Sequence, residues 1–150
     1  MPTLRPYIPT DAPACLALFD TNVPRYFAPH ERQDFATYLL HPDRTHDYLV
    51  IHCNGELVAC GGLALDNEHT AAFCWGMVDR TRHRQGLGRQ LSHARLAHAE
   101  TLGAQRVTLS TSQLTLYFYA GLGFVVTHIT PVGHGPGLVA VVLVLELAPH

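Results

Sequence analysis

One stretch of the sequence combines glycine and arginine in a way that suits the binding of a small anion. It runs from Val78 to Arg89 and joins an expected strand to the clearest expected helix. Gly86 and Gly88 let the backbone approach a ligand closely, and the N–H groups of a first helical turn point outward toward an anion. Arg84 and Arg89 can add charge-assisted contacts. The stretch therefore predicts a site for a phosphate-bearing ligand.

The distribution of charge favours the same interpretation. The chain has ten arginines, no lysine and twelve acidic residues, which gives a net charge of −2. No acidic residue occurs from 80 to 99, so this window carries +5 and the remainder carries −7. A uniformly basic surface would favour nucleic acid, which we do not expect as a partner, whereas one basic window favours a small anionic ligand. A solvated basic helix face is the alternative. The arginines of the window are Arg80, Arg82, Arg84, Arg89 and Arg95.

Two common phosphate-binding motifs do not fit this stretch. The dinucleotide pattern needs a third glycine where the chain has Leu91, and a P-loop needs a lysine. The segment His83-Arg84-Gln85-Gly86-Leu87-Gly88 instead resembles the Arg/Gln-x-x-Gly-x-Gly/Ala acyl-CoA loop of the GNAT N-acetyltransferase superfamily, with His83 at the position of the usual Arg or Gln. In that family the loop binds pyrophosphate largely through backbone N–H groups. The resemblance implies that these six residues and Arg89 bind acetyl-CoA.

A second motif follows further along the chain. Residues 118–124, from Phe118 to Phe124, resemble the Phe/Leu-Tyr-x-x-x-Gly-Phe block of the same family, in which the tyrosine hydroxyl faces the CoA sulfur. The resemblance implies that Tyr119 is the general acid that protonates the leaving thiolate, a role suited to an ordinary pKa near 10. It also implies a cofactor contact from Ser112, at a position where many members carry asparagine.

The resemblance further implies a mechanism. Acetyl-CoA, the cosubstrate, would lie in a V-shaped split between the strands at 70–78 and 106–110, with backbone groups of Met77 and Val78 paired to the pantetheine arm. A primary amine of a small molecule, peptide or protein would attack the thioester directly. The rate would come chiefly from positioning the two substrates, with backbone amides stabilising the oxyanion.

The general base is less defined by the sequence. The strand at 70–78 contains no carboxylate, although some family members carry one there. Glu68 and His69, just before it, could accept the amine proton through a water chain, or both could simply lie on the surface. An amine that arrives partly deprotonated is a further option. The missing carboxylate keeps open a non-catalytic acyl-CoA-binding sensor of the same fold, and a nucleotide-binding regulator is a third interpretation.

The chain contains eleven histidines, but their spacing does not predict a metal site. There is no His-Glu-x-x-His motif, and His93 and His98 are five residues apart, which places them on different sides of a helix. His98 falls on an apolar stripe and is expected to be half-buried. We therefore expect no metal.

The order of expected elements predicts the fold. Asn54-Gly55 is a strong hairpin turn between strands at 47–53 and 56–65. Leu87, Leu91, Ala94, His98 and Leu102 form the apolar stripe of a helix over 86–102. Together with Asp11 as a cap for a helix at 12–20, a helix at 30–40 and strands up to 147, this predicts one α/β (α+β) domain over 1–150. We expect a GNAT-like fold with a central mixed, mostly antiparallel sheet that is flanked by helices and split between the strands at 70–78 and 106–110. Residues 1–46 would supply acceptor-side helices and 47–147 the acetyl-CoA-binding core.

Other features bear on location and partners. The four cysteines form no CxxC pair, the N-terminal sequence lacks the apolar stretch of a signal peptide, and the longest apolar run is too short to span a membrane. These features predict a cytoplasmic protein without a membrane partner. A second subunit that covers the apolar last strand would make a homodimer, and coverage within one subunit is the alternative. Tyr26 and Phe27 would line the acceptor pocket or the core. The carboxylates considered for a cationic acceptor are Asp20, Glu31, Asp34 and Glu68.

Overall fold

A computed structural model describes residues 2–66, 69–82, 85–131 and 139–147. Within these residues, seven strands form one sheet in the order β1-β2-β3-β4-β5-β7-β6. All neighbouring strands are antiparallel except β4 and β5, which are parallel. This confirms the expected mixed, mostly antiparallel sheet. The strands are β1 (Thr3–Pro6), β2 (Tyr48–Cys53), β3 (Glu56–Leu65), β4 (Thr70–Val78), β5 (Arg106–Thr111), β6 (Val125–Thr130) and β7 (Ala140–Glu146).

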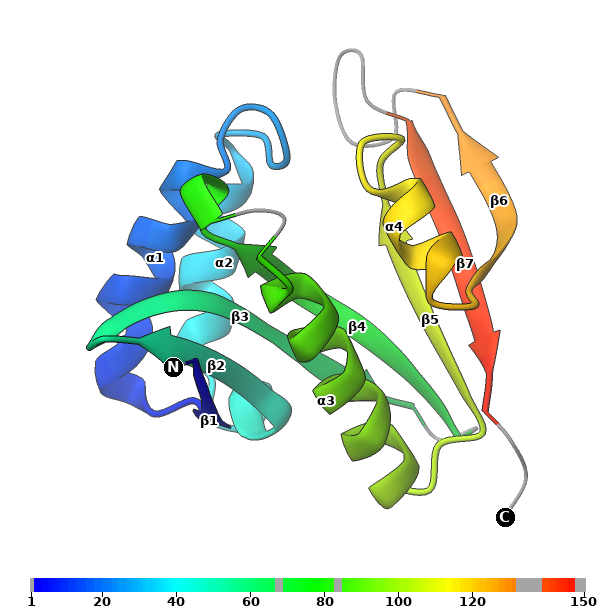
Figure 1. Ribbon diagram of the computed structural model, residues 1–150, viewed down its shortest axis with the longest axis horizontal. Coiled ribbons are helices and arrows are strands. Elements are labelled where there is room, and N and C mark those ends of the chain that lie inside the picture. Colours follow the sequence, from blue (N-terminus) through cyan, green and yellow to red (C-terminus); the bar gives the residue numbers. More distant parts are fainter. Residues whose placement is uncertain (1, 67–68, 83–84, 132–138, 148–150) are drawn as a thin grey trace.

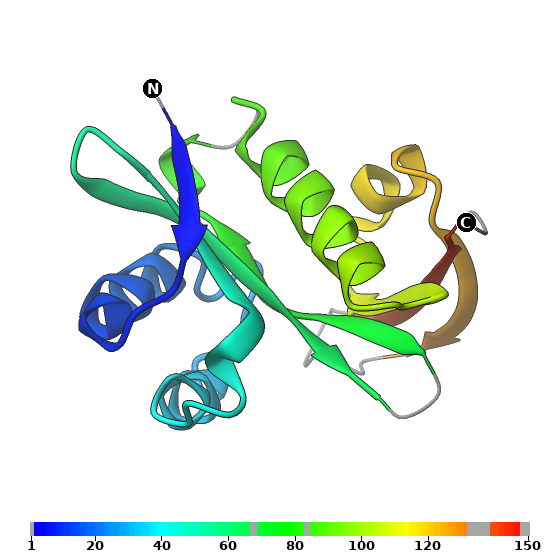
Figure 2. The same cartoon turned by 90° about the horizontal axis from the view of Figure 1, so that it is seen from below.

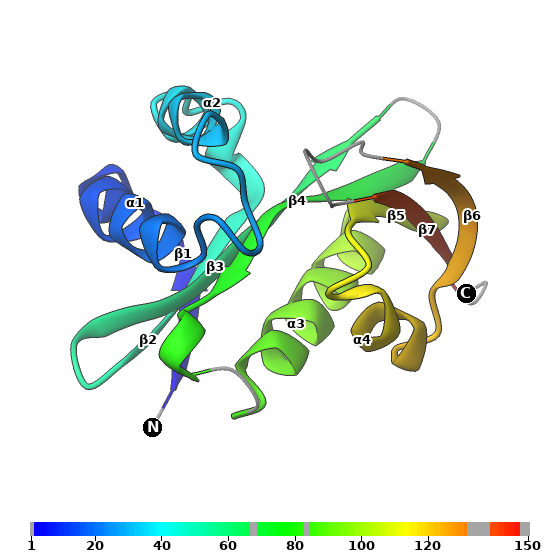
Figure 3. The ribbon, with the colours of Figure 1, turned by 90° about the horizontal axis from the view of Figure 1, so that it is seen from above.

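Helices cover both faces of the sheet. Figure 3 shows α1 and α2 on one face and α3 and α4 on the other, and Figure 2 gives the same arrangement from below. Short 3-10 turns precede α1 and β2 and follow β4. No helix of the described ranges is long and apolar enough to span a membrane. The helices are α1 (Ala12–Thr21), α2 (Glu31–Leu39), α3 (Leu87–Thr101) and α4 (Leu116–Gly121).

The sheet is split where the parallel pair ends. β4 and β5 are paired only from Thr70 opposite Arg106 to Ala72 opposite Thr108, and they separate from Phe73 and Leu109 onward. Figure 1 shows the two strands diverging toward their carboxyl ends. This confirms the split that was expected between these two strands.

A β-bulge lies on the edge of the split. Cys60 pairs with Met77 and Gly62 with Cys74, so two residues of β4, Trp75 and Gly76, oppose the single residue Gly61 of β3. Trp75 has a φ of 47°, which is unusual for a residue with a large side chain. A bulge bends its strand and redirects side chains, and here it curves β4 away from β5.

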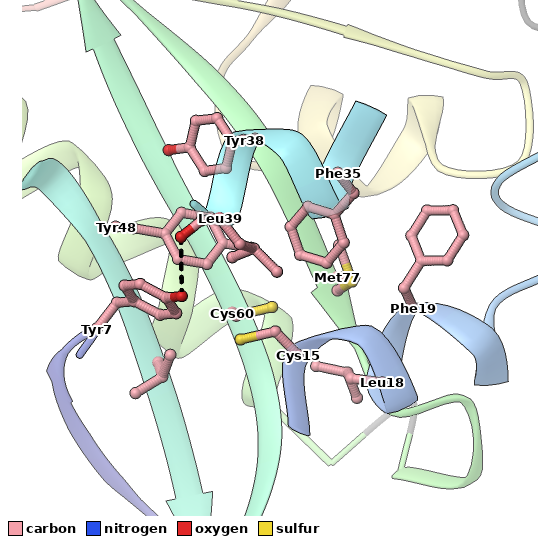
Figure 4. Close-up of a cluster of buried hydrophobic side chains, with 11 residues drawn as sticks. Tyr7, Cys15, Leu18, Phe19, Phe35, Tyr38, Leu39, Tyr48, Cys60 and Met77 are labelled. Carbon is pink, nitrogen blue, oxygen red and sulfur yellow. Dashed lines mark hydrogen bonds between the residues drawn. The ribbon is translucent and has the colours of Figure 1, made fainter. Parts of the chain in front are cut away.

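The face that carries α1 and α2 has an aromatic core. Phe35 stacks on Trp75 with ring centroids 5.0 Å apart, and Phe19 stacks on Phe35 at 5.7 Å. Tyr48 of β2 is fully buried beside them and donates a hydrogen bond to the carbonyl oxygen of Trp75 (2.8 Å). Figure 4 shows Phe19, Phe35 and Tyr48 of this cluster between the two helices and the sheet. The cluster therefore holds the bulge from one side of the sheet.

Two details of the helices differ from expectation. Asp11 makes no side-chain cap to α1; its carboxylate accepts hydrogen bonds from the Ile8 N–H (2.9 Å) and the Arg5 guanidinium (2.8 Å), because a 3-10 turn comes before the helix. On α3, Leu87 and Leu91 are buried and His98 is half-buried, as expected, and His98 Nε2 donates a hydrogen bond to the Asp47 carboxylate (2.7 Å). The buried face of α3 differs from expectation because it also includes Ser92, Arg95 and Ala99.

The last strand of the chain lies inside the sheet. β7 pairs with β5 on one side and with β6 on the other, and its alternate residues Val141 and Leu143 are buried. β6 forms the edge, where Val125 and Ile129 are exposed. The homodimer stays a prediction.

Candidate active site

A cleft with a volume of about 600 Å³ follows the split in the sheet. Residues of β4, β5, α3 and α4 line it, together with residues at the ends of α1 and α2. The cleft therefore brings together most of the residues that the sequence singled out. Its lining includes Asn22, Tyr26, Phe27, Glu31, Phe73, Trp75–Val78, Gly86, Gly88, Arg89, Ser92, Arg95, Leu109–Ser112 and Tyr119.

The N-terminus of α3 opens into this cleft. Gly86 has a φ of +83°, in the left-handed region that favours glycine. The first helical hydrogen bond runs from the Gln90 N–H to the Gly86 carbonyl oxygen (3.0 Å), so the N–H groups of Leu87, Gly88 and Arg89 have no acceptor within the helix. Such a turn carries a partial positive charge and suits an anion. The turn therefore offers three N–H groups to an anionic group such as a phosphate.

Close packing surrounds the second glycine of the motif. A Cβ atom on Gly88 would lie 3.3 Å from the ring of Phe118, so a side chain here would press on that ring, which would have to shift by a few tenths of an ångström. Gln85 is exposed beside Gly86, and Arg89 lines the cleft. His83 and Arg84, which were expected to take part, lie outside the described residues.

The edge of β4 is held at the same end of the cleft. Met77 is buried and Val78 is partly buried. The side-chain amide of Asn22 donates a hydrogen bond to the Val78 carbonyl oxygen (3.0 Å) and another to the Leu18 carbonyl oxygen (3.1 Å). Asn22 thus joins the end of α1 to the end of β4. Nothing in its sequence position predicts this contact.

Ser112 and Tyr119 lie on the opposite wall. Ser112 is buried, and its hydroxyl accepts a hydrogen bond from the Leu114 N–H (3.2 Å) in the turn that leads to α4. The Tyr119 ring is partly buried and makes edge-to-face contacts with Phe118 (5.0 Å between centroids) and Phe124 (5.9 Å). The ring therefore packs against its neighbours and also faces the cleft.

The expected base candidates are not brought to the cleft. His69 is exposed, has a φ of 63°, and its carbonyl oxygen accepts a hydrogen bond from the Gln105 N–H (2.7 Å). It lies at the closed end of the split and does not line the cleft. Glu68 lies outside the described residues. Cys74 is also a poor base, because burial raises the pKa of its thiol.

One carboxylate lines the part of the cleft that the structure describes. Glu31, at the start of α2, is partly buried and accepts a hydrogen bond from the Ala28 N–H (3.1 Å). Phe27, nearby, stacks on Trp75 with centroids 6.2 Å apart, so it serves both the core and the wall of the cleft. Asp20 is engaged by Arg32 at the surface (2.8 Å). No three potential metal ligands gather among the described residues.

Comparison with known proteins agrees with this geometry. The family model described as Acetyltransferase (GNAT) family matches residues 15–124. No curated protein matches the sequence. Among solved structures, one assigned to the GNAT family from Desulfovibrio desulfuricans has a TM-score of 0.83 and 20% identity, over 99% of this chain and 100% of that chain.

Two further solved structures resemble this chain to a similar degree. The ribosomal-protein-S18-alanine N-acetyltransferase from Escherichia coli has a TM-score of 0.80 and 23% identity, over 100% of this chain and 96% of that chain. The protein yncA from Salmonella typhimurium, whose structure contains its cofactor acetyl-CoA, has a TM-score of 0.80 and 17% identity over the same shares. At these identities the likeness concerns the fold.

Proposed function

This chain belongs to the acetyltransferase (GNAT) family, and from that premise we propose that it is an acetyl-CoA-dependent N-acetyltransferase acting on a primary amine of a small molecule. One observation carries the proposal. The open N-terminal turn of α3, the edge of β4 and the side chains of Ser112 and Tyr119 all line one cleft, although they are far apart in the sequence. The acetyl-CoA-bound relative of the same fold supports this choice of cosubstrate.

Each wall of the cleft has a role in this proposal. The N–H groups of Leu87, Gly88 and Arg89 bind pyrophosphate, and the Arg89 side chain adds a cation. The backbone of Met77 and Val78 pairs with the pantetheine arm, and Ser112 contacts it from the other wall. Bound acetyl-CoA supplies an activated acyl group as a thioester.

Proton transfer is assigned to Tyr119. The amine nitrogen forms a bond to the carbonyl carbon, the bond from that carbon to sulfur breaks, and the Tyr119 hydroxyl gives its proton to the leaving thiolate. The ring contacts with Phe118 and Phe124 fix the direction of this hydroxyl. Because neither His69 nor Cys74 is placed to accept the amine proton, water is the acceptor in this proposal.

The acceptor side favours a cationic amine. Glu31, Tyr26 and Phe27 line the end of the cleft next to α2, where a carboxylate and aromatic rings can attract an ammonium group. Peptide and protein amines are the other class of acceptor, and the Escherichia coli relative of the same fold is named for one. A panel that contains polyamines, aminoglycosides, amino acids and N-terminal peptides separates these classes.

The test is the release of free thiol from acetyl-CoA in the presence of that panel. We expect amine-dependent thiol release and an acetylated product by mass spectrometry. Binding of acetyl-CoA without transfer to any amine would favour the acyl-CoA-binding sensor, an alternative supported by the lack of a carboxylate on β4. Stabilisation by ADP or NAD equal to that by CoA would contradict both.

A further inference from the structure

Arg95 is a buried cation at the closed end of the cleft. It lies on α3, its side chain is only 2% exposed, and it is the largest fully buried side chain of the described residues. β4 and β5 part immediately after Ala72 and Thr108, and Arg95 lines the cleft there together with Phe73 and Leu109, the first unpaired residues. The basic window of the sequence thus contains one arginine that does not face solvent.

The sheet is shaped to hold this guanidinium. A Cβ atom on Gly76 would lie 2.9 Å from both Nη1 and Nη2 of Arg95, and a Cβ atom on Gly61 would lie 3.0 Å from Nη1. A side chain at Gly76 would force the guanidinium to shift, and one at Gly61 would press on it. The Arg95 Cζ atom lies 3.8 Å above the centre of the Phe73 ring, a cation–π contact. The two glycines and Phe73 form a cradle that fixes the position of the guanidinium.

The cradle leaves hydrogen-bonding capacity unused. Arg95 Nε is buried without a hydrogen-bond partner, and so is the Ser92 hydroxyl, one turn earlier on the same helix face and 1% exposed. Among the described residues, no carboxylate forms an ion pair with Arg95. An unpaired buried charge and an unpaired buried hydroxyl are each costly, and native proteins rarely keep them without a reason.

The position of the pair indicates which substrate would supply the missing partner. Ser92 and Arg95 lie on α3, the helix whose N-terminus is assigned to the pyrophosphate of the cosubstrate. Glu31 is the first residue of α2, Tyr26 and Phe27 come shortly before it in the chain, and Figure 3 shows α2 on the opposite face of the sheet from α3. Ser92 and Arg95 lie at the closed end of the split, on the α3 face. We therefore expect them to contact the acyl-CoA and not the acceptor amine.

We propose that Arg95 and Ser92 bind a carboxylate carried by the acyl group, so that the preferred donor is a dicarboxylic acyl-CoA of the succinyl class. This proposal rests on the proposed transfer of an acyl group from CoA to an amine, and it replaces acetyl-CoA by a dicarboxylic acyl-CoA as the preferred donor. The carboxylate neutralises the buried guanidinium and accepts a hydrogen bond from the Ser92 hydroxyl. The transfer itself is unchanged: the amine forms an amide with the thioester carbonyl, and the thiolate leaves with a proton.

The test compares donors that match in length and differ in charge. Succinyl-CoA and butyryl-CoA have four-carbon acyl chains, and acetyl-CoA is the short reference. We expect succinyl-CoA to bind and react with a kcat/KM at least tenfold higher than butyryl-CoA. In Arg95→Met this preference should fall by about 10- to 100-fold, the range of a lost hydrogen bond to a charged group. Arg106→Met, which removes an exposed arginine on β5, is the matched control and should keep the preference.

A second variant distinguishes loss of the proposed contact from misfolding. Ser92→Ala removes one hydroxyl and keeps the cation, so the succinyl preference should fall several-fold while thermal stability is kept. Ligand-induced shifts in Tm with succinyl-CoA and butyryl-CoA give a readout that is independent of turnover. Equal shifts and equal kcat/KM values for the two donors in the wild type would overturn the proposal.

Three further outcomes also decide the question. If Arg95→Met raises KM only for amino-acid acceptors and not for the corresponding decarboxylated amines, the carboxylate belongs to the acceptor and the donor proposal is wrong. If no CoA thioester stabilises the protein, the proposed function itself fails. Stabilisation by acetyl-CoA and butyryl-CoA but not by succinyl-CoA would overturn only the donor proposal.

Discussion

The side-chain amide of Asn22 donates a hydrogen bond to the carbonyl oxygen of Val78 (3.0 Å). This bond joins the residue that follows α1 to the last residue of β4. The two residues are far apart in the sequence, and the bond links an α1 end on one side of the cleft to the strand edge assigned to the pantetheine arm. The position of that edge therefore depends on the helical region at the N-terminus.

Removal of this amide should weaken both folding and cosubstrate binding. Asn22 is buried and donates to three acceptors, so Asn22→Asp, which keeps the shape but loses the NH₂ donor, should lower the free energy of unfolding by about 1–3 kcal/mol. The KM for acyl-CoA should rise several-fold. Urea unfolding and steady-state kinetics measure the two effects. Gln33→Ala, exposed on α2, should change neither, and an unaltered KM in Asn22→Asp would separate Asn22 from the site.

A charge at the start of α3 should abolish cosubstrate binding. The backbone of Gly86 is in the left-handed region, so Gly86→Asp adds backbone strain of about 1 kcal/mol. It also places a carboxylate beside the position proposed for the pyrophosphate. Gly55→Asp is the matched control, because Gly55 has a φ of +82° and open space around it at the hairpin turn. Isothermal titration with CoA should show binding lost in the first variant and kept in the second. Normal CoA binding by Gly86→Asp would contradict the assignment.

The hydroxyl of Tyr119 should matter for turnover rather than for binding. Tyr119→Phe keeps the ring contacts with Phe118 and Phe124, so KM should change little, whereas kcat should fall by about 10²-fold or more if proton transfer to the thiolate limits the rate. Thiol release at saturating substrates measures this. Tyr117→Phe, exposed on the same helix, should behave as wild type. An unchanged kcat in Tyr119→Phe would remove the general-acid assignment.

Glu31 should affect the acceptor and not the cosubstrate. Glu31→Gln keeps an oxygen for the Ala28 N–H and removes the negative charge, so KM for a cationic amine should rise roughly fivefold, in the range of a partly exposed ion pair. The KM for acyl-CoA should stay the same. Asp34→Asn, exposed on the same helix, is the control. The same KM for cationic amines in Glu31→Gln and wild type would place the acceptor elsewhere.

The Arg5–Asp11 pair should give a pH-dependent contribution to stability. The hydrogen bond from Arg5 lowers the pKa of Asp11 in the folded state. A lowered folded-state pKa means that the contribution is complete above the ordinary aspartate pKa and is lost as pH falls through the folded-state value. Asp11→Asn should therefore cost about 1 kcal/mol at pH 7 and almost nothing in strong acid. Urea unfolding at several pH values tests this, with the exposed Asp20→Asn as control.

The sequence predicts the strands well, for local reasons. The bounds of β2 and β3 agree with expectation to within one residue because the Asn54-Gly55 turn fixes where the hairpin between them lies. The turn at Gly86 is likewise local, because its left-handed backbone conformation favours glycine. These features depend on residues that are neighbours in the chain.

The buried part of the cleft depends on distant residues and was not predicted. The sequence groups Arg95 with the exposed arginines, whereas the structure buries it against Gly61, Gly76 and Phe73, which come from two other elements. The apolar pattern of α3 also misplaces its buried face, because the cradle in the sheet draws Ser92 and Arg95 inward. Helical periodicity alone cannot show that a polar side chain has a place prepared for it.

The short parallel contact between β4 and β5 has a mechanical consequence. Two antiparallel halves of the sheet, β1 to β4 and β5 to β7, are joined through only three register pairs, from Thr70–Arg106 to Ala72–Thr108. The cosubstrate, bound along the split as proposed, would lie where a strand is missing and would contact both halves. Its binding should slow amide hydrogen exchange both in β5 and in the carboxyl half of β4. The two halves of the sheet would then open as one unit and not separately.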